Sequence, residues 1–277
     1  MLLLARSTAL AVTCILVSAA LYGADQPITV GLVYDGATPE DREPLRAYLT
    51  KAMGRPVILQ AADLQSDNID RIANGSYDFA CLGALAYIRS HAQFGVIPLV
   101  QRTTDLYLHS VFITGAGSSI HSLSDLKGRL FAFGDINGAS THLIPYRELM
   151  RAGIDPQTDL KVRFSGSNPA TAALVQTGVV DAGALDETIF NALINDGKLD
   201  SQKVRVFYTS KPFVAYVFVA RKDVPVAERE RFARALLVLK AGKDDSVLRI
   251  LRAKRFVVAN DQEYAPIRQI AHQLNLF

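Results

Sequence analysis

A short turn, GDINGAST at residues 134–141, has the composition of an anion-binding site. It follows an apolar stretch that ends at Phe133 and leads into a helical segment, so we expect it to join a strand to a helix. Ser140 and Thr141 supply hydroxyl donors, and glycine lets the backbone approach a ligand closely. The first amides of a helix lack intrahelical acceptors and bind oxyanions without a lysine or arginine. The turn therefore predicts reversible capture of a tetrahedral oxyanion.

Similar polar turns follow other predicted strands. Ser165, Ser167 and Asn168 lie in the turn SGSNPAT, Asp186 lies in LDETIF, and Tyr34 ends the first predicted strand. Ligands of open α/β sheets bind beyond the carboxyl ends of the strands, where such turns lie. Ordinary helix capping is the alternative for each turn taken alone. The repetition of polar turns along one edge favours a shared ligand site.

The sequence lacks the motifs that signal catalysis or a metal centre. It contains no H-E-x-x-H, no paired C-x-x-C, no G-K-[ST] and no G-x-S-x-G, and its five histidines have no metal-ligand spacing. His109 and His142 are candidates to face the cleft. We therefore expect a binding protein and not an enzyme, with no catalytic residues, no metal and no cofactor.

Cys81 lies in a predicted strand near the same edge. A buried free cysteine usually behaves as a small hydrophobic residue. Contact between its thiol and a ligand is the other interpretation.

These turns need a scaffold, and the chain supplies alternating strands and helices. ITVGLVY at 28–34 is a nearly continuous apolar run, typical of a buried parallel strand. PEDREPLRAYLTKAMG at 39–54 is a predicted helix with acidic residues in its first turn and Gly54 as its stop. The alternation continues along the chain and predicts an α/β fold with parallel sheets.

The number of predicted strands is large for one open sheet, so we expect two lobes. Residues 25–110 and 212–277 would form lobe one, and residues 113–209 would form lobe two. The predicted strands near 108–114 and 212–220 would cross between them.

Residues 1–24 have the pattern of a signal peptide. A single basic residue precedes an apolar stretch and small residues, with no charge until Asp25. We expect cleavage and export to the periplasm, with a retained membrane anchor as the alternative. The net charge is +3 and no basic stripe interleaves with aromatic residues, so nucleic acid is not an expected partner.

Residues 122–190 resemble the phosphate/phosphite/phosphonate-type periplasmic substrate-binding proteins of ABC transporters. The resemblance is carried by D-L-K-G (125–128), the aspartate-containing turn before L-I-P (143–145), F-S-G (164–166) and V-D-A-G-A-L-D (180–186). The C-terminal RFVVANDQEYAPIRQIA is also similar. The resemblance covers nearly the whole chain after the leader and implies a class II periplasmic binding protein fold, in which two lobes with a hinge close over a ligand in the cleft.

The resemblance also implies a set of ligand contacts. Hydroxyls and amides of the turn before L-I-P hold the oxyanion in this family, and a tyrosine after the first strand completes the pocket with later turns. Transferred to this chain, the contacts are Tyr34, Ser140, Thr141, Ser167 and Asp186. The family turn often has the sequence S-T-S-G, so Ser140 matches it and residues 138–141 otherwise depart from it.

Other departures from the family pattern bear on the ligand. Ser167 stands where many phosphonate binders have a histidine, and the segment around Cys81 replaces an aromatic pair. The ligand alternatives are a phosphonate, a smaller oxyanion such as phosphite or phosphate, and arsenite held by Cys81.

We expect a monomer that captures a small anion and delivers it to the membrane permease of an ABC importer. The alternative is a sensor of an oxyanion or arsenite that presents its closed form to a membrane histidine kinase. A small-molecule enzyme of the same fold is the third hypothesis, and it would require a catalytic acid, base or nucleophile in the cleft.

Overall fold

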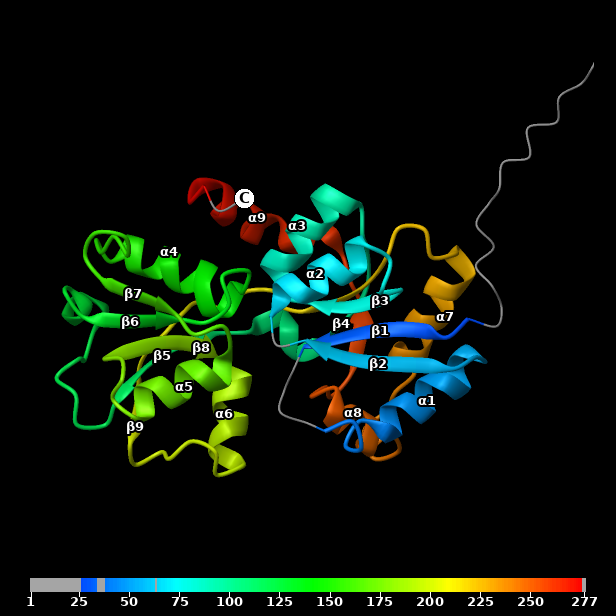
Figure 1. Ribbon diagram of the computed structural model, residues 1–277, viewed down its shortest axis with the longest axis horizontal. Helices are drawn as coiled ribbons and strands as arrows, with labels where there is room; N and C mark the ends of the chain where they lie inside the picture. The colour runs from blue at the N-terminus through cyan, green and yellow to red at the C-terminus, as the bar shows by residue number, and fades with distance from the viewer. Residues whose placement is uncertain (1–25, 34–37, 63, 276–277) are drawn as a thin grey trace, which may run out of the picture.

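A computed structural model describes residues 26–33, 38–62 and 64–275. The predicted signal peptide and Tyr34 lie outside the described residues. Two β-sheets, each covered by helices on both faces, lie side by side in Figure 1. We refer to the six-stranded sheet with its helices as the first lobe and to the five-stranded sheet with its helices as the second lobe.

The first lobe has the strand order β11-β4-β10-β3-β1-β2. Its strands are β1 (Ile28–Val33), β2 (Val57–Ala62), β3 (Phe79–Leu82), β4 (Ile97–Arg102), β10 (Val217–Ala220) and β11 (Phe256–Val258). Its helices are α1 (Glu43–Met53), α2 (Gln65–Ala73), α3 (Ala84–Phe94), α7 (Val226–Leu237), α8 (Asp245–Ile250) and α9 (Ala265–Gln273).

Successive residues of β3 and of β10 pack into two different cores of the first lobe. In β3, Phe79 and Cys81 pack toward α1, α7 and α8, whereas Ala80 and Leu82 pack toward α2, α3 and α9. This is the period of two that a strand imposes on its side chains. Helix α1 ends as expected at Gly54, whose φ of 72° is left-handed. Burial of apolar residues on both faces explains why the strands have nearly continuous apolar sequences.

The second lobe has the strand order β7-β6-β8-β5-β9. Its strands are β5 (Ser110–Gly115), β6 (Leu130–Phe133), β7 (Lys161–Phe164), β8 (Ala182–Asp186) and β9 (Val204–Thr209). Helix α4 (Ile144–Arg151) covers one face, and α5 (Asn168–Gln176) and α6 (Glu187–Asn195) cover the other. A π-helical turn, η3 (Ala139–Leu143), leads into α4.

Both sheets are mixed, which corrects the expectation of parallel sheets. Strand β5 runs antiparallel to β8 and β9, and β10 runs antiparallel to β3 and β4. The cause is the crossing between lobes. Ser110 at the start of β5 pairs with Asp186 at the end of β8, and Val217 at the start of β10 pairs with Leu82 at the end of β3. Each crossing strand therefore enters its sheet at the carboxyl edge and runs opposite to its neighbours.

The two crossings are themselves paired. Leu108 and Phe213 form an antiparallel bridge, and the Ser110 amide donates to the Ser210 hydroxyl at 2.9 Å. His109 lies in this crossing, and its Nδ1 is 2.7 Å from the backbone oxygen of Ser210. The crossings fall near the predicted positions, whereas the lobe boundaries at 110, 113, 209 and 212 stay a prediction.

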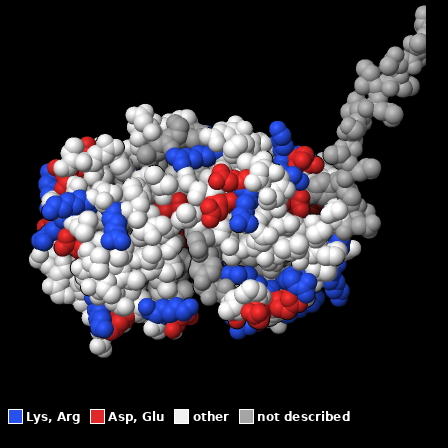
Figure 2. Space-filling view, viewed as in Figure 1, with Lys and Arg blue, Asp and Glu red and all other residues white. Residues whose placement is uncertain are grey.

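Apolar contacts also join the lobes away from the crossings. Ala139, Leu143 and Ile144 of the second lobe belong to the same buried cluster as residues of α3 and α9. Helix α9 lies over α3 at the top of Figure 1. On the face drawn in Figure 2, positive and negative side chains are interspersed over both lobes. Within the described residues, no helix is long and apolar enough to cross a membrane.

Candidate functional site

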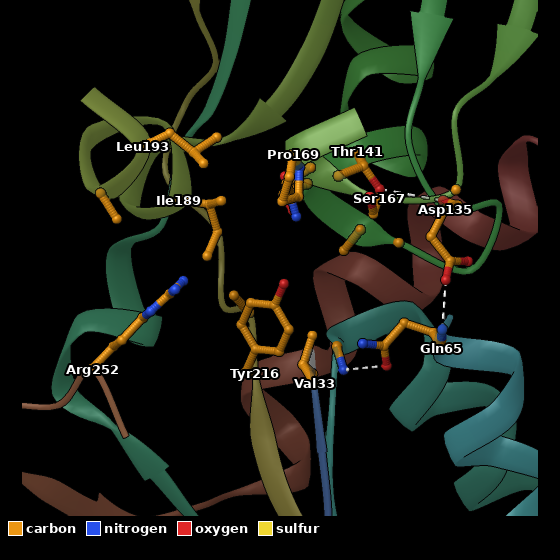
Figure 3. Close-up of a pocket in the computed structure, with 18 of the residues that line it drawn as sticks. Val33, Gln65, Asp135, Thr141, Ser167, Pro169, Ile189, Leu193, Tyr216 and Arg252 are labelled. Atoms are coloured by element: carbon orange, nitrogen blue, oxygen red, sulfur yellow. Dashed lines mark hydrogen bonds between the residues drawn. The ribbon is translucent and has the colours of Figure 1, made fainter. Parts of the chain in front are cut away.

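A cavity of about 60 Å³ lies at the carboxyl ends of strands from both sheets. It has room for several atoms the size of a water molecule, because one such atom needs roughly 10–15 Å³. Polar residues such as Asp135, Thr141 and Ser167 form one side, and the apolar residues Ile189 and Leu193 lie on the other side together with Arg252 (Figure 3). The lining residues that the argument uses are Val33, Gln65, Gly83, Asp135, Gly138, Ala139, Ser140, Thr141, Ser167, Asn168, Ile189 and Tyr216.

The turn between β6 and η3 is closed by Thr141. Its hydroxyl donates to the backbone oxygen of Asp135 at 3.2 Å, and its backbone oxygen accepts from the Gly134 amide at 3.0 Å. A Cβ on Gly138 would lie 2.0 Å from the Thr141 hydroxyl oxygen, and a Cβ on Gly134 would lie 2.6 Å from the Thr141 Cβ. Thr141 therefore packs so closely against both positions that a side chain larger than that of glycine would displace it. The Thr141 hydroxyl mainly maintains the turn.

The same turn presents unpaired donors to the cavity. The first backbone bonds of η3 come from the amides of His142 and Leu143 to the Gly138 oxygen. The amides of Ala139, Ser140 and Thr141 have no acceptor within the described part of the chain. The Ser140 side chain is 5% exposed, and its hydroxyl also has no partner there, although the Ser140 backbone oxygen accepts from the Ser110 hydroxyl. These groups form a preorganised donor set for an oxyanion.

The next turn adds the N-terminus of α5. Ser167 is its N-cap, and the Ser167 hydroxyl accepts from the Ala170 amide at 3.3 Å. Asn168 accepts from the Asp186 amide through Oδ1 at 2.8 Å, which leaves its side-chain NH₂ as a donor at the cavity wall. Capping and ligand binding are compatible here, because the capping hydroxyl accepts one hydrogen bond and retains a proton to donate.

The first lobe supplies the N-termini of α2 and α3. The Gln65 side chain accepts from the Gly83 amide at 3.1 Å, which fixes the start of α3 against the start of α2. The Gln65 amide itself donates to Asp135 Oδ2 of the second lobe at 2.5 Å. Burial raises the pKa of Asp135, and its hydrogen bonds from the amides of Gln65 and Asn137 oppose that rise. This contact joins the two walls of the cavity.

Tyr216 stands between the polar and apolar sides of the cavity (Figure 3). Its hydroxyl points into the cavity and has no hydrogen-bond partner among the residues described. Burial raises the pKa of this hydroxyl, and the Asp186 carboxyl raises it further. The group therefore stays protonated at neutral pH and is available as a donor.

The arrangement suits an anion that is bound and released. Four helix N-termini, those of α2, α3, α5 and the η3–α4 segment, have first-turn residues at the cavity wall. Each N-terminus carries a partial positive charge. Among the described residues, no group of three or more His, Cys, Asp or Glu side chains could hold a metal ion.

A family model of the ABC transporter, phosphonate, periplasmic substrate-binding protein matches residues 34–264. The chain belongs to this family of phosphonate-type periplasmic substrate-binding proteins. The assignment confirms the resemblance seen in the sequence and the two-lobed α/β fold, and it identifies a solute-binding transport protein and not an enzyme.

Individual family members support the assignment. The probable ABC transporter phosphite binding protein PhnD1 of Prochlorococcus marinus (strain MIT 9301) is 30% identical over 213 residues, which cover 72% of each chain. A structure of PhnD1 from this organism in complex with methylphosphonate matches with a TM-score of 0.83 at 25% identity, covering 91% of this chain and 99% of that one. A binding protein component of a Pseudomonas aeruginosa ABC phosphonate transporter matches with a TM-score of 0.81 at 20% identity, covering 89% and 85%. The latter likeness concerns the fold alone.

The structure brings part of the predicted binding set together. Ser140, Thr141 and Ser167 all line the cavity. Asp186 instead caps α6, where its Oδ1 accepts from the amides of Thr188 and Ile189. Cys81 lines a neighbouring chamber, in which burial raises the pKa of its thiol to about 12. The ligand-binding roles of these residues stay predictions, as does that of Tyr34.

Neither histidine that was expected to face the cleft lines the cavity. His109 lies in the crossing between the lobes, against the backbone oxygen of Ser210. His142 packs among Phe133, Tyr146 and Phe164 and does not line the cavity. Sequence reasoning missed Gln65, Asp135 and Tyr216. Asp135 stands in the quoted turn, but a carboxylate beside an anion site is not expected from charge alone. The other two come from α2 and from the β9–β10 crossing, where no motif marks them.

Proposed function

We propose that this family member binds a small phosphorus oxyanion of the phosphonate, phosphite or phosphate class in the cavity between its lobes. The observation that carries the proposal is the convergence of helix N-termini and of the Ser140 and Tyr216 hydroxyls on one cavity. Ser140, Thr141 and Ser167 would bind the ligand through their hydroxyls or amides. Lys198 and Arg252 also line the cavity, but helix amides can hold an oxyanion without a lysine or arginine.

Ligand capture would be coupled to closure of the lobes. The cavity wall combines the η3 turn and α5 of the second lobe with Gln65, Gly83 and Tyr216 of the first. A ligand that contacts both walls stabilises the state in which the walls are together. The closed form would then dock on the membrane permease of the ABC importer that the family serves.

The ligand class is supported by two properties of relatives. The P. marinus PhnD1 structure contains methylphosphonate, and the curated relative is described as a probable phosphite-binding protein. Both ligands are small tetrahedral anions, in agreement with a cavity of about 60 Å³. Cys81 is a poor candidate for holding arsenite, because a thiol with a pKa near 12 remains protonated.

Export by the leader at residues 1–24, a periplasmic location and a monomeric state complete the proposal. Export and the periplasmic location are supported by the apolar leader and by the family's role. The sensor role remains the alternative prediction. A complex of the ligand-bound protein with an ABC permease would support transport, whereas a complex with a histidine kinase alone would support sensing.

Thermal unfolding in the presence of a ligand panel tests the proposed function. The panel contains phosphite, methylphosphonate and phosphate, with sulfate and glutamine as controls. A ligand at about 100 times its Kd stabilises the folded protein by about 2.7 kcal/mol. For a chain of this size that shift corresponds to a Tm increase of roughly 5–10 °C. An increase with phosphorus oxyanions alone supports the proposal, and no increase with any of them contradicts it.

A further inference from the structure

A buried ion pair lies beside the ring of Tyr216. Arg102 is the last residue of β4, and Asp105 lies in η1 (Thr103–Tyr107), at the start of the crossing that leads to the second lobe. The Nε and Nη2 atoms of Arg102 donate to the two carboxylate oxygens of Asp105 at 2.6 and 2.7 Å. The two side chains are only 14% and 2% exposed. A two-pronged contact of this kind fixes the plane of the guanidinium group.

The guanidinium group of Arg102 also lies over the Tyr216 ring. Its remaining nitrogen, Nη1, donates to the backbone oxygen of Leu251 at 3.1 Å. Its central carbon is 5.2 Å from the centre of the Tyr216 ring. A cation in this position is attracted to the face of the ring, and the attraction is stronger where water is excluded. The fixed guanidinium group therefore restricts where the ring can lie.

Asp105 acts on the backbone of the same segment. Its backbone oxygen accepts a hydrogen bond from the Ala215 amide at 2.8 Å. Burial raises the pKa of the Asp105 carboxyl, and the backbone amide of Tyr216 is among the groups that oppose this rise. The pair on the first crossing therefore contacts both the ring and the backbone segment of Tyr216 on the second crossing.

The pair also affects the Tyr216 hydroxyl as a hydrogen-bond donor. Burial raises the pKa of this hydroxyl, and Arg102 lowers it more strongly than Asp105 raises it. A positive charge beside a phenol favours the ionised form. The same charge strengthens the hydrogen bond that the phenol donates to an anion, so Arg102 should improve the binding of an oxyanion by Tyr216.

Arg102 itself is placed to act through Tyr216. Tyr216 lines both the oxyanion cavity and the neighbouring chamber of Cys81, whereas Arg102 lines the chamber alone. Arg42 also lines this chamber, and Arg252 lines both spaces. Direct contact between an anion and these arginine side chains is therefore the alternative that the experiment must separate.

We propose that the Arg102–Asp105 ion pair positions Tyr216, so that its hydroxyl is directed at the bound oxyanion and donates a stronger hydrogen bond to it. Arg102 and Asp105 are positioning residues and do not contact the ligand. This inference rests on the proposed function, because Tyr216 must donate to an oxyanion in the cavity.

A double-mutant cycle tests the inference by calorimetric titration with methylphosphonate and phosphite. Arg102→Met is combined with Asp105→Asn, because the loss of one partner alone would leave a buried charge unpaired. This paired variant should raise the Kd about fivefold, the factor that corresponds to a cation–π contact. Tyr216→Phe should raise the Kd about tenfold or more. In the Tyr216→Phe background, the paired change should alter the Kd by less than about twofold.

The cycle distinguishes the inference from its alternative. The same fold-change in both backgrounds would overturn the inference, because the pair would then act without Tyr216, as in a direct contact between the ligand and the arginines. An unchanged Kd in the paired variant or in Tyr216→Phe would also overturn it. In each of these cases the proposed function survives. If the unmodified protein binds neither ligand, the proposed function fails together with the inference.

Arg102→Lys provides the same test if the paired variant does not fold. Lysine retains the charge but lacks the planar, two-pronged guanidinium group. It should raise the Kd in the wild-type background and leave it unchanged in the Tyr216→Phe background, and equal effects in the two would overturn the inference.

A second ion pair of the first lobe supplies the matched control. Arg221 Nη2 donates to Asp78 Oδ1 at 3.1 Å, the side chains are 20% and 12% exposed, and neither residue lines the cavity or the chamber. Arg221→Met combined with Asp78→Asn should leave the Kd unchanged. An increase equal to that of the Arg102 variant would mean that loss of any such pair weakens binding, and would overturn the positioning role.

Discussion

The carboxylate of Asp135 in the second lobe accepts a hydrogen bond from the backbone amide of Gln65, the first residue of α2 in the first lobe, at 2.5 Å. Asp135 and Gln65 are both buried and both line the oxyanion cavity. A carboxylate at a helix N-terminus is stabilised by the amide and by the helix dipole. This hydrogen bond can form only when the two lobes are together, so it stabilises the closed form.

Removal of the Gln65 amide proton should weaken ligand binding. Proline is tolerated at the first position of a helix and lacks the N–H group. Leu64 before it has φ −109° and ψ 144°, the extended conformation that precedes proline. Gln65→Pro should raise the Kd for methylphosphonate about tenfold or more relative to Gln65→Ala, because a hydrogen bond to a charged group contributes about 1.5–3 kcal/mol.

Gln65→Ala is the control because it removes the same side chain, including its contact with the Gly83 amide, and keeps the Gln65 amide. Both variants are titrated by calorimetry and compared by small-angle scattering with ligand present. Equal Kd values for the two variants would show that the contact with Asp135 does not support closure.

Ser140→Ala should reduce affinity with little effect on stability. The Ser140 hydroxyl has no partner among the described residues, so its removal breaks no internal hydrogen bond. Loss of one hydrogen bond to a charged ligand should raise the Kd about tenfold or more. Calorimetry gives the Kd and urea unfolding gives the stability. Ser246→Ala, at an exposed position of α8, is the control with no expected change in either. An unchanged Kd in Ser140→Ala would remove this hydroxyl from the site.

Gly138→Ala should abolish tight binding. The added Cβ would lie 2.0 Å from the Thr141 hydroxyl oxygen and 3.0 Å from the Asp135 backbone oxygen, so the turn must open. A Cβ on Gly117 meets nothing within 4 Å, and Gly117→Ala is therefore the matched control. Binding is measured by calorimetry after circular dichroism has established that each variant is folded. Near-normal affinity of folded Gly138→Ala would contradict the role of the turn.

The strands and most helices could be predicted because their signals are local. The apolar run at 28–34 corresponds to β1, and Gly54 ends α1 as expected. The sequence SDNIDRIANG predicts a helix that begins with Ser66 or Asp67 as its N-cap. In the structure α2 begins earlier, because both residues lie inside the helix and Leu64 occupies the N-cap position without a side-chain cap. Strand β11 was missed, since three residues at a sheet edge depend on pairing with β4. The antiparallel entry of β5 and β10 follows from the crossings between lobes, which no local pattern encodes.

The polar turns predicted the second-lobe side of the cavity, because helix starts have recognisable compositions. Ser140 and Ser167 are at the cavity wall for that reason. Gln65 and Tyr216 could not be predicted, since each reaches the site only when the two lobes are assembled. The location of Asp186 shows the limit of the same reasoning. Its helix-capping role and a ligand role have the same sequence signature.

The Cys81 thiol should resist alkylation in the folded protein. With a pKa of about 12, the thiolate fraction at pH 8 is about 10⁻⁴, and the thiolate is the reactive form. Iodoacetamide labelling of Cys81, followed by peptide mass mapping, should be roughly a thousandfold slower than in urea. Labelling at similar rates in both states would mean that the thiol is ionised or exposed in the folded protein.

Asp186→Asn should change the pH dependence of stability. Burial raises the pKa of the Asp186 carboxyl above its ordinary value, and Oδ2 has no hydrogen-bond partner among the residues that the structure describes. Below about pH 3 the carboxyl is mostly protonated in both states, and its ionisation has little effect on stability. As pH rises, the unfolded state ionises first, so the wild-type free energy of unfolding falls until the folded pKa is passed. The Asn variant cannot ionise at this position, so its free energy of unfolding does not fall for this reason.

The stability difference, Asn variant minus wild type, should therefore increase between pH 4.5 and pH 8 in urea unfolding experiments. Asparagine retains an oxygen for the amides of Thr188 and Ile189, whereas Asp186→Ala also removes the cap and should lose about 1 kcal/mol more. A difference that stays constant with pH would mean that the folded-state pKa of Asp186 is not raised.

The central claim is that the cavity between the lobes binds a small phosphorus oxyanion through the η3 turn. Calorimetric titration of the unmodified protein and of Ser140→Ala with methylphosphonate and phosphite tests it most directly. The account predicts saturable one-to-one binding of at least one of the two ligands, and a Kd about tenfold or more higher in Ser140→Ala. The absence of binding to both ligands, or the same Kd in the two proteins, would contradict it.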